Sequence, residues 1–375
     1  MPTSSQMKIY IGGMAGTRKT QVIKAVSHFF STSKELYRLL MLAPTGTAAA
    51  LLAGSTYHSV LGINDFRKGT TPKKLAEIRN HILRVDHIFL DEVSMLSCLD
   101  LFKISSQLAS IHNCHDRPFG GINMIFAGDF AQLPPAIGGE GISLYSRFVG
   151  CTSSTLRSQE EALGRALWHQ VTTVVILQQN MRQRHMSSED DQLWTALSNM
   201  RYKDCTEEDI SFLKSKITSS LPNHSSITHP QFAHVSIITA CNLDKDEINR
   251  LGCIKFARMT GQLLSDFYSE DHLHLTKTNY ANRNPNQKQP TSIPYGLQNE
   301  LWHLPHSTAD KHIPGILSLC IGMPIMIKYN EATELCITNS QEASVIGWES
   351  SLGPWKVPVL DTLFVLLTNP PSPSI

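Results

Sequence analysis

The residues that could carry chemistry begin with a glycine-containing segment near the start of the 375-residue chain, "GGMAGTRKT" at residues 12–20. Loops that bind nucleotide phosphates follow the pattern Gly, four free positions, Gly, Lys and then Ser or Thr. Backbone N–H groups in such a loop form a nest for phosphate oxygens, and the following helix adds its dipole. Lys19 would then bind the β- and γ-phosphates, and the Thr20 hydroxyl would bind Mg²⁺. The predicted loop comprises Gly13, Met14, Ala15, Gly16, Thr17, Arg18, Lys19 and Thr20, with Arg18 in place of the second glycine.

A second chemical motif, Asp91-Glu92, ends the apolar run in "HIFLDEVSML". After a phosphate loop, Asp91 is suited to bind Mg²⁺ directly or through water, and Glu92 is suited to polarise the attacking water. The structural alternative is a helix start, because acidic residues favour a first turn. The combination with a phosphate loop favours the catalytic interpretation.

Two further polar residues follow apolar runs. Gln132 lies in "FAGDFAQLPPA", where it could sense the γ-phosphate or position the water, with Asp129 as its anchor. Arg182 lies in "LQQNMRQ" and, delivered from a second domain, would neutralise charge in the transition state as an arginine finger. The structural alternatives are a proline-rich turn and a solvated surface arginine. The order of the motifs along the chain favours the catalytic roles.

Charge and composition limit which other kinds of binding site and protein class the chain can represent. The formal net charge is +1, so any contact with nucleic acid must come from a local groove. None of the eight cysteines forms a CxxC pair, which indicates reduced thiols in an intracellular protein. The segment "HNCHD" at residues 112–116 has no second cluster at zinc spacing, so we expect it to be structural or solvated. No apolar run reaches the roughly 18 residues of a membrane span.

The pattern of apolar runs predicts an α/β fold with a parallel sheet. Continuous apolar strands alternate with helical patterns in the first half, which is typical of a sheet covered on both faces. The candidate residues lie just past the ends of strands, where open parallel sheets bind ligands. The predicted strands are residues 7–13, 37–44, 85–92, 122–129 and 172–179, and the predicted helices are 19–30, 47–53 and 57–63.

The pattern changes near residue 182. Amphipathic helices come first, followed by a strand that leads into another helix, a long loop rich in Asn, Pro and Gln, and finally a β-rich module. The helices are predicted at 186–204, 206–217 and 243–253, the strand at 234–242, the loop at 275–306 and the β-rich runs at 322–330, 343–349 and 360–367.

Five motifs in this order, the phosphate loop, "APTGTAAALLAGSTYHSVLGI", "DEVSM", "GDFAQLPP" and "NMRQ", resemble the Pif-type family of ATP-dependent DNA helicases, of superfamily one and related to RecD. Residues 304–349 resemble members associated with Helitron-like transposons. The resemblance implies a P-loop NTPase with a RecA-like parallel sheet, ATP and Mg²⁺ as cofactors, and 5′-to-3′ translocation. It divides the chain into a RecA-like ATPase domain at 1–170, the start of a second RecA-like domain at 171–270, and an insertion with an incomplete β-rich module at 271–375.

The resemblance also implies DNA contacts. By carry-over, Pro44, Thr45 and Gly46 touch the DNA backbone, and His58 lies in the same DNA-facing segment. Short residues and a hydroxyl suit phosphate contacts that read no bases, and a helix capped by Thr45 is compatible with this role. The implied partners are single-stranded DNA or DNA junctions, with no membrane, and a monomer in the nucleus is expected. The implied roles are DNA repair, recombination and telomere maintenance.

The sequence departs from the family in three places. Arg18 adds a side chain where the backbone must approach phosphate closely, so we expect weakened nucleotide binding. Only "MPTSSQ" precedes the first strand, where the family has a Gln-containing segment that contacts adenine. The family's later segments, which contain Ser-Gln-Gly and Ala-Leu-Ser-Arg, do not occur before Ile375. We therefore expect a chain truncated at both ends, with an incomplete second domain.

The sequence thus predicts an ATP-dependent DNA helicase that hydrolyses Mg-ATP at a domain cleft. The alternative from another class is a catalytically inactive, transposon-derived fragment with at most weak nucleotide or DNA binding. A phosphate-loop kinase or GTPase is a weaker alternative, because "GDFAQLPP" and "APTGTAA" have no place in those families.

Overall fold

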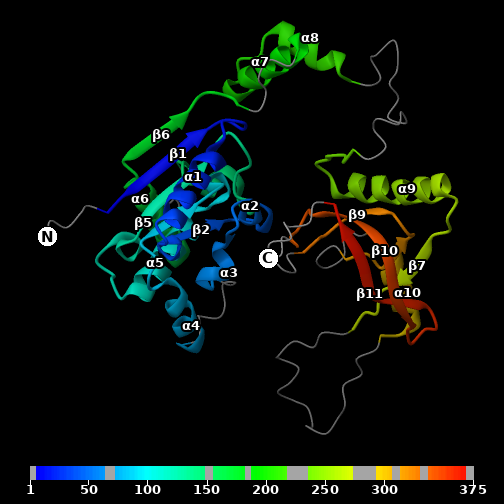
Figure 1. Cartoon of the computed structure of the whole chain (residues 1–375). Coiled ribbons are helices and arrows are strands. Elements are labelled where there is room, and N and C mark those ends of the chain that lie inside the picture. Colours follow the sequence, from blue (N-terminus) through cyan, green and yellow to red (C-terminus); the bar gives the residue numbers. More distant parts are fainter. Residues whose placement is uncertain are drawn as a thin grey trace. The chain divides into compact units, whose positions relative to one another are not determined.

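The structure is a computed structural model that divides into two compact units (Figure 1). The first unit comprises Met1–His229 with Tyr329–Asn339, and the second comprises Pro230–Lys328 with Ser340–Ile375. The two units are described separately. The structure describes residues 6–63, 72–147, 155–181, 187–217, 235–272, 293–305, 313–329 and 337–368.

The described part of the first unit is built on a six-stranded sheet in which every pairing is parallel. Its strands are β1 (Lys8–Gly13), β2 (Leu39–Ala43), β3 (Ser55–Thr56), β4 (His87–Leu90), β5 (Asn123–Gly128) and β6 (Thr173–Leu177). The spatial order is β3-β2-β4-β5-β1-β6, so β6 belongs to this sheet, although residues 171–270 were assigned to the second domain from the sequence. The predicted parallel sheet is confirmed.

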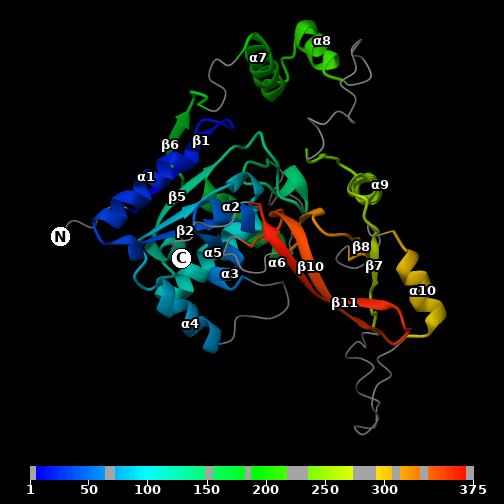
Figure 2. The same cartoon turned by 45° about the vertical axis from the view of Figure 1, so that its right-hand side comes forward.

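Alternate side chains of the buried strands enter two cores, one on each face of the sheet. On β5, Met124 and Phe126 pack on one face, whereas Ile125 and Ala127 pack on the other. Burial on both faces explains why the strands read as continuous apolar runs. The helices around the sheet, visible in Figures 1 and 2, are α1 (Lys19–Thr32), α2 (Gly46–Leu51), α3 (Tyr57–Leu61), α4 (Pro72–Ile82), α5 (Cys98–His112) and α6 (Leu156–Trp168).

The larger core lies between the sheet and helices α3 to α6, and the smaller core lies on the face covered by α1. Helix α5 begins at Cys98 because Ser97 and Asp100 form a capping box. Helix α6 lies directly against this helix start. A Cβ atom added at Gly164 of α6 would overlap the backbone carbonyl of Cys98, so the two helices depend on glycine for their close approach.

A hairpin of two helices follows the sheet, α7 (Ser188–Tyr202) and α8 (Glu207–Ser215), as the amphipathic pattern predicts. The side-chain amide of Asn199 donates a 2.8 Å hydrogen bond to Asp209, whose carboxylate also accepts from the backbone N–H of Thr206. Because Asp209 is buried and completes the capping box of α8, this contact joins the end of one helix to the start of the next.

The second unit packs one long helix against antiparallel strands. Its core includes Ala257, Phe267, Met323 and Val345, with Trp348 at its margin. Three strands form one sheet in the order β11-β10-β9, and β7 pairs with β8. The elements are α9 (Asn242–Thr260), β7 (Ser265–Tyr268), α10 (Tyr295–His303), β8 (Ile316–Leu319), β9 (Pro324–Met326), β10 (Glu342–Leu352) and β11 (Pro358–Leu367).

Two local predictions in the second unit are wrong. Residues 235–241 form no strand, although "HVSIITACN" is rich in β-branched residues. Val235, Ile237 and Ile238 are exposed, and no described strand pairs with them. Helix α10 lies inside the predicted loop, where Trp302 is buried and its Nε1–H donates to the carbonyl oxygen of Ser269. The predicted β-rich runs correspond to β9, β10 and β11. No helix in the described ranges is long and apolar enough to cross a bilayer.

The contact between α5 and α6 predicts the effect of a single methyl group. Substitution Gly164→Ala should lower the free energy of unfolding by about 2 kcal/mol, because overpacking a tight site costs roughly 1–3 kcal/mol. Gly252→Ala is the matched control, since a Cβ atom there meets open space inside helix α9. This control should leave stability unchanged or raise it by up to about 1 kcal/mol. Equal denaturation midpoints for the two variants would contradict the prediction.

Candidate nucleotide-binding site

The predicted phosphate loop connects β1 to α1. Gly13 ends the strand where there is no room for a side chain, because a Cβ atom would lie 2.7 Å from the carbonyl oxygen of Leu177 on the neighbouring strand. Thr17 is buried and its hydroxyl donates to the Met14 carbonyl at 2.8 Å, which closes the loop on itself. Gly16 accepts a 2.8 Å hydrogen bond from the backbone N–H of Met181, the residue before Arg182. Arg182 itself lies outside the described residues.

Arg18 has the left-handed backbone conformation, with φ 61° and ψ 39°, directly before the first turn of α1. This conformation is the physical reason for glycine at this position, since a Cβ atom makes it unfavourable. The side chain of Arg18 is exposed. Arginine in place of glycine therefore strains the backbone of the loop at the residue before Lys19.

Lys19 lies between the loop and a group of carboxylates. Its Nζ donates to the carbonyl oxygens of Gly13 at 2.7 Å and Met14 at 3.3 Å. Burial lowers the pKa of Lys19, and the negative charges of Asp129, Glu92 and Asp91 act in the opposite direction, in that order of strength. The next residue, Thr20, is half-buried on the first turn of α1.

Asp91 and Glu92 follow β4. The carboxylate of the buried Asp91 accepts a 2.9 Å hydrogen bond from the backbone N–H of Glu92, which has the left-handed conformation, with φ 50°. Burial raises the pKa of Asp91, and burial followed by the charge of Asp91 raises the pKa of Glu92. Two neighbouring carboxylates that burial pushes toward the neutral form are a site that a divalent cation would stabilise.

Gln132 lies on a turn that begins at the end of β5. Its backbone N–H donates to the carbonyl oxygen of Asp129 at 2.9 Å, and the side chain is exposed. The carboxylate of Asp129 accepts from the backbone N–H of Ala131 at 3.1 Å. Asp129 therefore holds the turn at two atoms, the anchoring role that the sequence suggested.

Sequence reasoning missed Arg201, on the last turn of α7. Its guanidinium binds both carboxylate oxygens of Asp129, at 2.6 and 2.8 Å. The carboxylate is only 3% exposed and the guanidinium side chain 22% exposed. Burial alone would raise the pKa of Asp129, but the bonds and charge of Arg201, with the Ala131 N–H, hold this pKa below its usual range. Arginine in the last turn of a helix is typical of any helix end, so no local pattern linked it to a partner 72 residues away.

The residues expected to contact DNA follow two neighbouring strands. Thr45 comes after β2 and caps α2 by accepting from the backbone N–H of Ala48 at 3.3 Å, with half-buried Pro44 before it and buried Gly46 after it. His58 lies on α3, which follows β3, and its exposed ring stacks on Tyr57 at 3.9 Å between centroids. Because β2 pairs with β3, the two segments begin at the same edge of the sheet.

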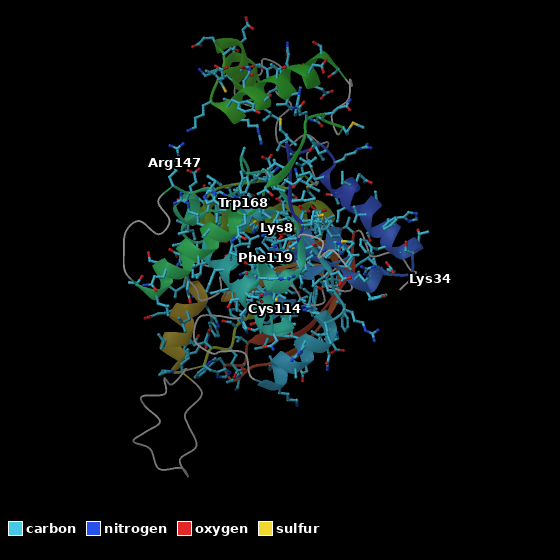
Figure 3. The ribbon with its side chains drawn as sticks, turned by 90° about the vertical axis from the view of Figure 1, so that its left-hand side faces the viewer. Lys8, Lys34, Cys114, Phe119, Arg147 and Trp168 are labelled. Carbon is cyan, nitrogen blue, oxygen red and sulfur yellow. The ribbon has the colours of Figure 1, made fainter. Side chains whose placement is uncertain are left out.

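The "HNCHD" segment begins at His112, the last residue of α5, and contains Cys114, which is labelled in Figure 3. The thiol of Cys114 donates to the carboxylate of Asp116 at 3.2 Å. Among the described residues, no group of three His, Cys, Asp or Glu side chains is arranged to hold a metal ion.

The loop, the Asp-Glu pair and the Asp129–Gln132 turn lie at the carboxyl ends of the adjacent strands β1, β4 and β5, an arrangement that defines a P-loop NTPase of RecA-like fold. The family model described as PIF1-like helicase matches residues 2–202, more than half of the chain. The chain belongs to the PIF1-like helicase family.

Known relatives are consistent with this assignment. The ATP-dependent DNA helicase PIF1 of Emericella nidulans is 27% identical over 280 residues, covering 72% of this chain and 36% of that protein. The ATP-dependent DNA helicase PIF1 of Trypanosoma brucei brucei is 37% identical over 134 residues, covering 34% of this chain and 14% of that protein. The chain thus spans well under half of the length of these curated relatives.

A solved structure shares the fold. The crystal structure of Pif1 helicase from Bacteroides in complex with ADP-AlF3 and ssDNA aligns with 95% of this chain and 70% of its own, with a TM-score of 0.54 and 20% sequence identity.

The left-handed backbone at position 18 predicts the effect of restoring glycine. Substitution Arg18→Gly should raise the free energy of unfolding by about 1 kcal/mol, the usual cost of this conformation for a residue with a Cβ atom. It should also lower the dissociation constant for ATP. Lys34→Gly is the matched control, because Lys34 has φ 58° and is exposed but follows the far end of α1, where Figure 3 labels it. The control should gain stability without a change in affinity. Equal affinities of the parent and Arg18→Gly would contradict the prediction.

The ion pair between Asp129 and Arg201 predicts a pH-dependent contribution to stability. The pKa of Asp129 in the folded chain lies below its unfolded value of about 3.9, so the pair stabilises the fold above that pH and this stabilisation is lost as the pH falls through the folded value. Near neutral pH, Arg201→Met should lower the free energy of unfolding by about 2 kcal/mol, less than the roughly 3–5 kcal/mol of a fully buried pair because solvent screens Arg201.

Urea denaturation of the parent and Arg201→Met between pH 7 and pH 3 measures this difference, which should shrink below about pH 4. Arg250→Met is the control, since Arg250 also makes two bonds to one carboxylate, that of Glu247, but in an exposed pair. It should not change stability measurably at either pH. A difference between the parent and Arg201→Met that is constant with pH would refute the assignment.

Proposed function

We propose that the chain is an ATP-dependent DNA helicase that hydrolyses Mg-ATP and translocates 5′ to 3′ on single-stranded DNA or DNA junctions. The observation that carries the proposal is the position of Lys19, on a phosphate loop and in the field of the carboxylates of Asp129, Glu92 and Asp91. Two relatives are described as ATP-dependent DNA helicases, and a related structure contains ADP-AlF3 and single-stranded DNA, which supports the choice of cofactor and partner.

The proposed chemistry assigns one task to each residue. Lys19 would exchange its carbonyl partners for phosphate oxygens, and the backbone from Gly13 to Thr20 would donate N–H groups to the phosphates. Thr20 and Asp91 would hold Mg²⁺, which supplies charge neutralisation at the phosphates when bound. Glu92 would accept the proton of the attacking water, a task that its raised pKa suits.

Two further residues complete the proposed site. Gln132 would orient the attacking water or sense the γ-phosphate from its turn after β5, and Arg182 would neutralise charge in the transition state. The hydrogen bond from Met181 to Gly16 supports a place for Arg182 at this site, because it attaches the neighbouring residue to the phosphate loop.

The proposed DNA contacts lie on the segments after β2 and β3. Gly46 and the capped start of α2 would present backbone N–H groups to a DNA phosphate, while Pro44 and Thr45 would add short side chains. His58, with its exposed ring stacked on Tyr57, would offer a planar surface next to them. Such contacts would be independent of base sequence.

Arg18 supports a second candidate function. A chain that binds nucleotide or DNA weakly without turnover would tolerate a strained residue in the phosphate loop, whereas efficient hydrolysis requires close backbone approach. A nuclear location, a role in DNA repair, recombination or telomere maintenance, the Helitron-like character of residues 304–349 and the three-part domain division rest on the sequence resemblance and stay predictions.

The steady-state rate of ATP hydrolysis, with and without single-stranded DNA, distinguishes the two candidates. The helicase proposal predicts hydrolysis that DNA stimulates and that Lys19→Ala reduces by at least about 100-fold, because the lysine contacts the transferred phosphoryl group. A parent chain no faster than Lys19→Ala would exclude the enzyme and leave the non-catalytic candidate. Restored hydrolysis in Arg18→Gly would then assign the loss to the loop.

A further inference from the structure

The turn that carries Gln132 is held from within the ATPase fold at two points. The hydroxyl of Tyr10 on β1 donates to the carbonyl oxygen of Gly128 at 3.2 Å, where the turn begins. The ring of Phe130 packs against Tyr10 and against Trp168 of α6, with centroid distances of 5.3 and 5.5 Å; Trp168 is labelled in Figure 3. These contacts fix the first part of the turn to the sheet and to α6.

A third contact fixes this turn, and it comes from α7, which is not one of the helices that cover the sheet. Arg201 grips both oxygens of Asp129, and one of these oxygens also accepts the N–H of Ala131. Among the described residues of the turn, only Asp129 forms a bidentate ion pair with α7. A bidentate pair fixes direction as well as distance, so the orientation of Asp129 depends on where α7 lies.

The helix that carries Arg201 is bonded to its neighbour α8 close to the ion pair. Asn199, on the same last turns of α7, is bonded to Asp209 at the start of α8, so the hairpin is tied together next to the ion pair. At the other end, Met181 is bonded to the phosphate loop. Met181 and Arg201 are thus each bonded to a residue beside the proposed nucleotide site, Gly16 and Asp129 respectively.

The carboxylate of Asp129 also interacts electrostatically with two cationic side chains, Lys19 and Arg201. The charge of Asp129 acts on Lys19 more strongly than that of Glu92 or Asp91, and the charge of Arg201 reaches Lys19 as well. Arg201 therefore lies within electrostatic range of the lysine that would bind the phosphates. If Arg201 moved away, a buried carboxylate without its partner would remain beside Lys19 and the turn.

We propose that Arg201 is a positioning residue for ATP hydrolysis, which holds the Asp129–Gln132 turn in place and couples the α7–α8 hairpin to it. The inference rests on the proposed function above. Arg201 contacts Asp129 rather than the reacting atoms, and it acts through the position of Gln132. A displacement of about 1 Å in a group that positions reactants can slow the chemical step by roughly 100-fold.

The first test is a split between kcat and KM for ATP under saturating single-stranded DNA. Arg201→Met should lower kcat by at least about tenfold while KM changes by less than about threefold, because the loop that binds the phosphates is not altered. Arg201→Lys should recover only part of kcat, since an ammonium cannot make the bidentate contact. Arg250→Met, which removes the exposed bidentate pair of α9, should match the parent. A kcat for Arg201→Met equal to that of the parent, or a loss confined to KM, would overturn the proposal.

The second test measures the turn itself and does not need catalysis. Hydrogen exchange of the peptide covering residues 129–133, in the folded chain, should accelerate by at least about tenfold in Arg201→Met, because the Ala131 N–H loses its fixed acceptor. The comparison is made at short labelling times, at which the core strand β4 should stay protected in both proteins, so that a loosened turn is distinguished from general destabilisation. Unchanged exchange in the turn would overturn the inference even if kcat falls.

The two tests separate this inference from the proposed function. A parent chain without ATP hydrolysis would refute the helicase proposal and, with it, the catalytic part of the inference, while faster exchange would still establish that Arg201 fixes the turn. A parent chain that hydrolyses ATP, with an Arg201→Met variant of equal kcat and equal exchange, would refute the inference alone.

Discussion

The burial of charge next to the phosphate loop is the constraint on which the candidate site depends. Lys19 is half-buried, and burial lowers its pKa, whereas the charges of Asp91 and Glu92 after β4 and of Asp129 after β5 act in the opposite direction. Burial raises the pKa values of Asp91 and Glu92, whereas Arg201 helps to hold the pKa of Asp129 below its usual range. A parallel sheet satisfies this constraint because its strands all deliver their carboxyl ends to one edge.

The sheet could be predicted from the sequence because its strands are buried on both faces. The runs 88–90 and 124–128 contain no polar side chain, and the polar residues that follow them mark the edge of the sheet directly. The order of the motifs along the chain made the helicase family predictable as well, and the family model that matches residues 2–202 supports that prediction. The left-handed conformation at position 18 was implied by the glycine that the loop pattern requires there.

Other features could not be predicted, because they depend on contacts between distant segments. Arg201 has the surroundings of an ordinary helix end, and only the folded chain brings it to Asp129. The run Val235 to Ile238 has the composition of a strand, yet strand formation requires a partner as well as propensity, and none of the described strands pairs with it. Helix α10 could not be recognised from the sequence because polar residues flank it and its buried side chains are only Trp302 and Gln298.

The left-handed arginine in the loop also has a genetic consequence. Every arginine codon can become a glycine codon by a change of its first base, from CGN to GGN or from AGA and AGG to GGA and GGG. Mutation therefore supplies the ordinary loop residue at position 18 in a single step. Where nucleotide turnover by this chain matters to its host, selection can act on that single change. The presence of Arg18 therefore reflects how strongly selection acts on the loop, because a codon for glycine is always one base change away.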